Sequence, residues 1–248
     1  MKKPFIYLLT AGLAVSMITS TNTVDGATSE ATIQFTSPSD SVSPVNPENP
    51  SEPNPDAEDQ GTVTGEAGDL TLDFVADISF GAENTISSSE KTYYSTTQRP
   101  YIQVSDRRGT GEGWDVIASA SEFTDSSGNT LRGAVLGFTG TEAVSDSTYN
   151  DPVINAPTTD DFEIITGPEG TEPAVANATP DTESMETAKG VGTWVMRWLN
   201  PNLETDPNST SNTNVYLTVP GGAATSNSQY TSTITWTLTA GPSTDQID

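Results

Sequence analysis

Hydrophobic and polar residues alternate along two long stretches of the chain, at residues 70–80 and 230–240. A period of two is the spacing of a β-strand that buries one face, so both stretches predict half-buried strands. In the second stretch the alternate positions hold threonine, a residue suited to the exposed side of a pleated sheet. These threonines stand at positions 231, 233, 235, 237 and 239.

Shorter apolar segments lie between the two long ones, separated by clusters of Gly, Asn, Asp and Pro that are typical of turns. They cover residues 101–104, 114–119, 131–138, 193–199 and 215–219. The acidic segment 150–188 is expected to be a surface insertion with one strand at 162–165. No stretch repeats with a helical period. Roughly six or more antiparallel strands predict an all-β protein, built as an antiparallel β-sandwich.

The N-terminus has the pattern of a secretory signal. Met1, Lys2 and Lys3 precede an apolar run over residues 4–18, which is too short to span a bilayer. Small and polar residues follow, as far as Ala27. We interpret residues 1–27 as a signal peptide, so the mature protein is expected to be secreted, without direct membrane insertion after cleavage.

Prolines mark the next segment, residues 28–68. Four of them recur at every third position: Pro44, Pro47, Pro50 and Pro53. Three residues per turn is the repeat of polyproline II, so this segment predicts a disordered, extended Pro-rich spacer. The predicted β-sandwich domain then covers residues 69–242, and an acidic tail covers 243–248.

Composition removes several function classes. The chain has 248 residues, with no Cys and no His, 9 Lys+Arg and 34 Asp+Glu, for a net charge of −25. Disulfides, His-dependent triads and Cys- or His-ligated zinc are therefore excluded. An oxygen-ligated calcium site stays open at Asp160-Asp161-Phe162-Glu163, but the chain has no EF-hand spacing, so we predict no metal and no cofactor. The negative charge disfavours nucleic acid as a partner. A two-carboxylate glycosidase stays open as an alternative, although no acidic pair stands out.

The C-terminal alternation ends in a motif that resembles the closing motif of the WxL-domain family. It consists of Tyr230, a threonine-rich stretch, Trp236-Thr237-Leu238 and Pro242. An earlier Trp114-Asp115-Val116 resembles the family's first motif, with Val116 in place of leucine. Matching stretches at 68–74, 78–81, 131–134 and 215–220 extend the resemblance over residues 27–242.

The resemblance implies a non-enzymatic surface protein of Gram-positive bacteria that binds peptidoglycan of the cell wall non-covalently. It also implies assembly with WxL-interacting, membrane-linked proteins and with other surface proteins. A protein-interaction module, held at the surface only through such a membrane-linked partner, is the alternative.

Six residues are candidates for the motif or a binding site: Trp114, Val116, Trp236, Leu238, Trp194 and Trp198. Trp236 and Leu238 share one face of their strand, as Trp114 and Val116 do, so we expect both pairs in the core. The binding surface would then lie along the threonine rows or in loops. The alternative is that Trp194 or Trp198 is exposed and stacks on sugar rings. Arg107 and Arg108 are expected to form internal ion pairs rather than to bind wall phosphates.

Overall fold

The computed structural model describes residues 28–147, 150–203, 205–206 and 208–241. The chain divides into two units, Met1–Phe35 and Thr36–Asp248. In the first unit, residues 28–35 are exposed and carry no helix or strand. The predicted signal peptide and the acidic tail lie outside the described residues, so both stay predictions.

Strands dominate the part of the chain that the structure describes, and every strand pair is antiparallel, which confirms the all-β prediction. The elements are α1 (Ala57–Gln60), β1 (Gly61–Val63), β2 (Leu70–Ala76), β3 (Lys91–Ser95), β4 (Tyr101–Asp106), β5 (Trp114–Ala120), β6 (Val135–Phe138), β7 (Glu142–Val144), β8 (Phe162–Ile165), β9 (Ala174–Ala178), β10 (Gly192–Arg197), β11 (Asn212–Val219) and β12 (Ile234–Ala240).

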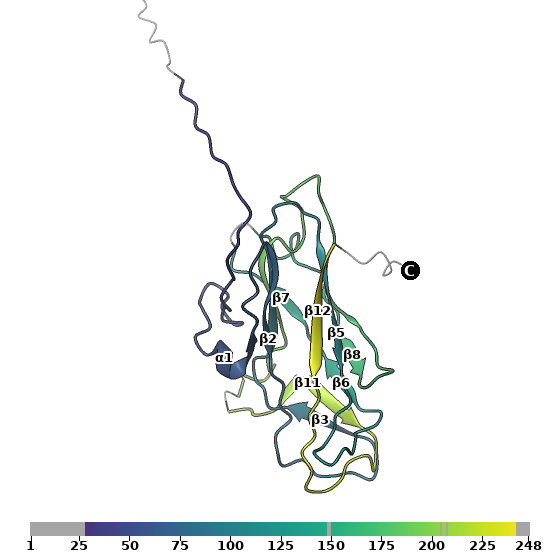
Figure 1. The fold of residues 1–248 in the computed structure, drawn as a ribbon. Helices are drawn as coiled ribbons and strands as arrows, with labels where there is room; N and C mark the ends of the chain where they lie inside the picture. Colours follow the sequence, from purple (N-terminus) through teal and green to yellow (C-terminus); the bar gives the residue numbers. More distant parts are fainter. Residues whose placement is uncertain (1–27, 148–149, 204, 207, 242–248) are drawn as a thin grey trace, which may run out of the picture. The chain divides into compact units, whose positions relative to one another are not determined.

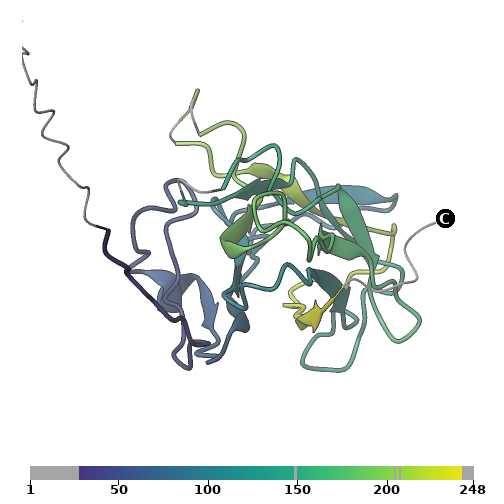
Figure 2. The same ribbon diagram turned by 90° about the horizontal axis from the view of Figure 1, so that it is seen from above.

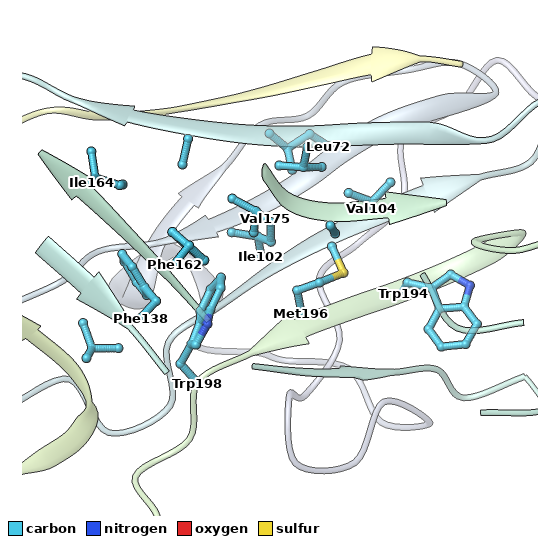
Figure 3. Packing of buried hydrophobic residues seen from close by; sticks show 14 of the residues in the cluster. Leu72, Ile102, Val104, Phe138, Phe162, Ile164, Val175, Trp194, Met196 and Trp198 are labelled. Atoms are coloured by element: carbon cyan, nitrogen blue, oxygen red, sulfur yellow. The ribbon is translucent and has the colours of Figure 1, made fainter. Parts of the chain in front are cut away.

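Three sheets surround one main apolar core (Figures 1 and 2). Their strand orders are β1-β2-β4-β10-β7, β3-β11-β6-β8 and β12-β5-β9. Apolar side chains from all three sheets meet in this core, which Figure 3 shows from close by. The segment expected to be a surface insertion contributes more than the expected strand β8. It also supplies β9, which pairs with β5 and buries Val175 and Ala176.

A β-bulge divides the first alternating stretch between two faces. Leu72 lies opposite Val104, but Phe74 lies opposite Gln103, so Asp73 is an extra residue on β2. One inserted residue turns the following side chains to the other side of the sheet. Leu72 therefore packs in the main core, whereas Phe74 stacks on Tyr101 on the opposite face, with ring centroids 4.4 Å apart.

The segment expected to be a disordered spacer folds over that opposite face. We call residues 40–63 the N-terminal strap. Val45 N donates to Gln103 Oε1 at 2.8 Å, Arg197 Nη1 donates to the Pro47 carbonyl at 2.6 Å, and β1 pairs with β2. The physical reason is that Phe74, Tyr101 and Val195 form an apolar patch that would otherwise face water.

Candidate functional site

The two signature motifs lie on neighbouring strands, although they are far apart in the sequence. β12 pairs with β5 so that Trp236 lies opposite Ala118 and Leu238 lies opposite Val116. Ala240 completes the register opposite Trp114. Figure 1 shows the two strands side by side, with β12 in yellow. The motifs are thus one structural feature, made when the last strand joins the middle strand of its sheet.

The side chains of the motifs point into the main core. Trp114 and Val116 are 0% exposed, and the Trp114 indole donates to the Gly190 carbonyl at 3.0 Å. Trp236 and Leu238 are half-buried and pack against the same core. The expectation of core packing is therefore confirmed for the first pair, and the second pair forms the rim of that core.

Aromatic rings hold the rim in place. The ring of Trp236 stacks on that of Trp198, with centroids 5.8 Å apart and planes at 29°. Phe138 meets both rings, at 5.9 Å from Trp236 and 4.9 Å from Trp198. Figure 3 shows Trp198 beside Phe138 and Phe162 in this cluster. Edge-to-face and offset-stacked arrangements of this kind add stability beyond burial alone.

The alternative interpretation, in which Trp194 or Trp198 is exposed, is wrong. Trp194 is 0% exposed and Trp198 is 1% exposed. The Trp194 indole donates to the Val191 carbonyl at 3.0 Å, and the Trp198 indole donates to Thr141 Oγ1 at 2.8 Å. In Figure 3 Trp194 lies beyond Met196, away from the other labelled rings. Neither ring is open for stacking on a sugar.

The opposite face of the same sheet is polar. Thr235, Thr237 and Thr239 of β12 are exposed and lie opposite residues of β5 in a regular ladder. On β5 the ladder continues with Ser119, the half-buried Ile117 and the buried Asp115. Asn177 of β9 donates its amide to the Asp115 carboxylate. We call this surface the threonine face. It presents the threonine hydroxyl groups, with the partly exposed Asn177 amide beside them, on a regular strand ladder.

A hollow of about 730 Å³ opens where the threonine face meets the loop between β8 and β9. Ser119, Ser121 and Glu122 line one side of it, and Thr171 and Glu172 line the other. Gly167 N donates to the Ala120 carbonyl at 2.9 Å, which ties the loop to the end of β5. The hollow adds two carboxylates and further hydroxyls to the polar surface. The sequence analysis missed this site because the loop approaches β5 only in the folded chain.

Arg107 and Arg108 form ion pairs within the chain, as expected. Arg108 Nη2 lies 2.7 Å from Asp106 Oδ2, with both side chains nearly buried, and Arg107 Nη1 lies 3.1 Å from Asp40 Oδ1. Carboxylate neighbours raise the pKa of Arg108, the hydrogen bond that its guanidinium donates to Asp106 being the largest cause. This pair is therefore not a phosphate-binding surface.

A buried polar cluster under the N-terminal strap also escaped the sequence analysis. The Asp73 carboxylate accepts hydrogen bonds from Ser105 Oγ at 2.7 Å, Gln103 Nε2 at 2.9 Å and Thr71 Oγ1 at 2.6 Å. Burial is the largest influence and raises the pKa of Asp73 above 3.8, while these hydrogen bonds oppose the shift. The cluster is closed to solvent, and we assign it to the attachment of the strap.

Across the described ranges, no group of three or more acidic side chains is arranged to hold a metal ion. In the same part of the chain, no helix has the length and apolar character needed to cross a bilayer.

Comparison with known proteins gives one family. The model of the family described as "WxL domain surface cell wall-binding" matches residues 22–242, which is most of the chain. No curated protein and no solved structure matches significantly.

Proposed function

Because the chain belongs to the WxL family of surface cell wall-binding domains, we propose that it binds peptidoglycan non-covalently, without enzymatic activity. We further propose that it is secreted and takes part in a multi-protein surface complex. Membership of the family makes it a cell-wall-binding surface protein, and the ligand and the complex are what the proposal adds.

The threonine face supports this proposal more than any other feature. Peptidoglycan offers sugar hydroxyls, acetamido groups and peptide amides, all of which exchange hydrogen bonds with hydroxyl side chains. Thr235, Thr237 and Thr239 repeat at the two-residue spacing of β12, so they offer a row of equivalent contacts. Weak contacts repeated along a polymer add up through multivalency.

The charge of the chain fits contacts of this neutral kind. The net charge is −25, and peptidoglycan with its attached polymers is also anionic, so long-range electrostatics oppose binding. Salt screens that repulsion, with a Debye length of about 10 Å at 0.1 M. Sedimentation with wall material is therefore expected to increase with ionic strength. Loss of binding in roughly 0.3 M salt would contradict hydrogen-bonded recognition.

Co-sedimentation with protein-free sacculi tests the proposed site. A variant carrying Thr235→Val, Thr237→Val and Thr239→Val keeps the branched shape of each side chain and removes only the hydroxyls. We expect about a tenfold or greater loss of affinity, from three hydrogen bonds each worth about 0.5–1.5 kcal/mol. The matched control is Thr92→Val with Thr213→Val, exposed threonines of the sheet that contains β3 and β11. That control should sediment like the wild type.

Two results would redirect the proposal. If the folded wild type does not sediment with sacculi, the result supports the alternative, a protein-interaction module that is held at the surface only by a membrane-linked WxL-interacting partner. If a zymogram with wall material shows clearing, the protein is an enzyme. The hollow at the threonine face then supplies the pair to test, by Glu122→Gln and Glu172→Gln.

A further inference from the structure

β12 is an edge strand with one free side. It pairs only with β5, and the hydrogen bonds Ser121 N to Thr233 O and Gly241 N to Gly113 O fix the direction of its backbone groups. Odd-numbered residues point their N–H and C=O groups at β5, so the even-numbered residues point theirs away from it. These include Trp236 and Leu238. Among the described residues, no other strand or loop pairs with these outward backbone groups.

This edge lacks the features that normally protect an exposed strand. Protective features are charged side chains, proline, bulges, short length and covering loops. The seven residues of β12 contain no charge, no proline and no bulge. The other edge strands each have at least one: Lys91 in β3, Glu142 in the three-residue β7, Glu163 in the four-residue β8, a bulged register in β9, and three residues only in β1. β12 is thus the acceptor that the described fold leaves open.

A segment of the chain has the matching pattern and no strand partner among the residues that the structure describes. Residues 31–36 read Ala-Thr-Ile-Gln-Phe-Thr, in which apolar Ile33 and Phe35 alternate with polar residues. Ile33 is 79% exposed and Phe35 is 83% exposed, and the segment has no secondary structure of its own. The family match begins at residue 22, so this segment lies within the region that the family model covers.

We propose that residues 31–36 of one copy add as a strand to the free edge of β12 in a second copy. Strand addition pairs the outward backbone groups of β12, and Ile33 and Phe35 extend the half-buried rim formed by Trp236 and Leu238. Thr32, Gln34 and Thr36 then continue the exposed threonine row. Donor and acceptor are different surfaces, so the contact is heterologous and links copies into rings or chains.

Light scattering after size-exclusion chromatography of the mature chain, residues 28–248, tests the proposal over a range of concentrations. The wild type should show a mass above that of one chain, increasing with concentration. The donor variant Ile33→Asp with Phe35→Asp should raise the dissociation constant at least tenfold. The matched control is Val153→Asp, which also replaces an exposed apolar side chain, 85% exposed, and should associate like the wild type.

An acceptor variant makes the test specific. In Ala240→Pro the lost N–H points to the free edge and the replaced side chain is exposed, so the fold is retained while strand addition is blocked. The donor and acceptor variants should each fail to associate alone. Mixed together, they should form a one-to-one dimer, because one keeps the donor and the other keeps the acceptor.

A wild type that stays monomeric at all concentrations would overturn the proposal, and so would a mixture that fails to recombine although both variants are folded by circular dichroism. Dissociation of Val153→Asp to the same extent as the donor variant would also overturn it. None of these measurements uses wall material, so they are independent of peptidoglycan binding.

Discussion

The stacked pair Trp198 and Trp236 gives the sharpest test of what the family signature does. Trp198 is 1% exposed, Trp236 is half-buried, and their ring centroids lie 5.8 Å apart. If the signature is a folding element, replacing either tryptophan by alanine must lower the free energy of unfolding. If it is a ligand contact, Trp236→Ala should leave that free energy nearly unchanged.

The expected magnitudes follow from burial. Trp198→Ala removes a fully buried indole and should cost about 3–5 kcal/mol. Trp236→Ala should cost roughly half as much, about 1.5–2.5 kcal/mol, because part of the ring is already in water. Since the rings are stacked, the double variant should lose about 0.5–1.5 kcal/mol less than the sum of the two single losses. Against a total stability of about 5–15 kcal/mol, each loss is measurable.

Urea unfolding at 25 °C, followed by circular dichroism, measures all four members of this cycle. Folded Trp236→Ala should still sediment with sacculi, because the proposed binding surface is on the other side of its strand. The reasoning would be refuted by a Trp236→Ala variant that keeps its unfolding free energy within about 0.5 kcal/mol, the usual range for surface changes, and loses wall binding.

Three further predictions concern the strap, the buried acid and a close backbone contact. Gln103→Ala removes a buried anchor of the N-terminal strap; it should cost about 1–3 kcal/mol and speed limited proteolysis within the strap. Burial raises the pKa of Asp73 in the folded chain, so the contribution of Asp73 to stability should fall as pH rises through the interval above 3.8. Hydrogen bonds lower the pKa values of Asp125 and Asp181, whose contributions rise with pH, so the comparison with Asp73→Asn isolates Asp73. In urea unfolding, the change in unfolding free energy from pH 4 to pH 7 should be more negative for the wild type than for Asp73→Asn. Gly190 has φ +70°, and a Cβ there would lie 2.6 Å from Trp114 Nε1, so Gly190→Ala should lower the melting temperature more than the control Gly128→Ala, at φ +85° with open space.

The candidate site was only partly accessible to sequence reasoning. The alternation of threonine with apolar residues identified the polar side of β12 and placed Trp236 on its inner side. The hollow beside it, with Glu122 and Glu172, gave no sequence signal, because the loop after β8 reaches the end of β5 only through tertiary contacts. Trp194 and Trp198 were left open between two interpretations, since spacing groups side chains on one face and does not say whether that face is covered.

By itself, the sequence determined the fold class, strands β2 and β12 and the family motifs, because period-two alternation and turn residues act over a few neighbouring positions. Tertiary structure alone decided which side of its sheet each apolar side chain occupies and which segment covers that side. The bulge at Asp73 sends Phe74 to the opposite side of the sheet from Leu72, and the proline-rich segment folds over that side as a strap. Both outcomes have the same physical reason. A sheet with apolar groups on two faces must cover both, and the residues that cover the second face come from a segment whose composition alone resembles a free spacer.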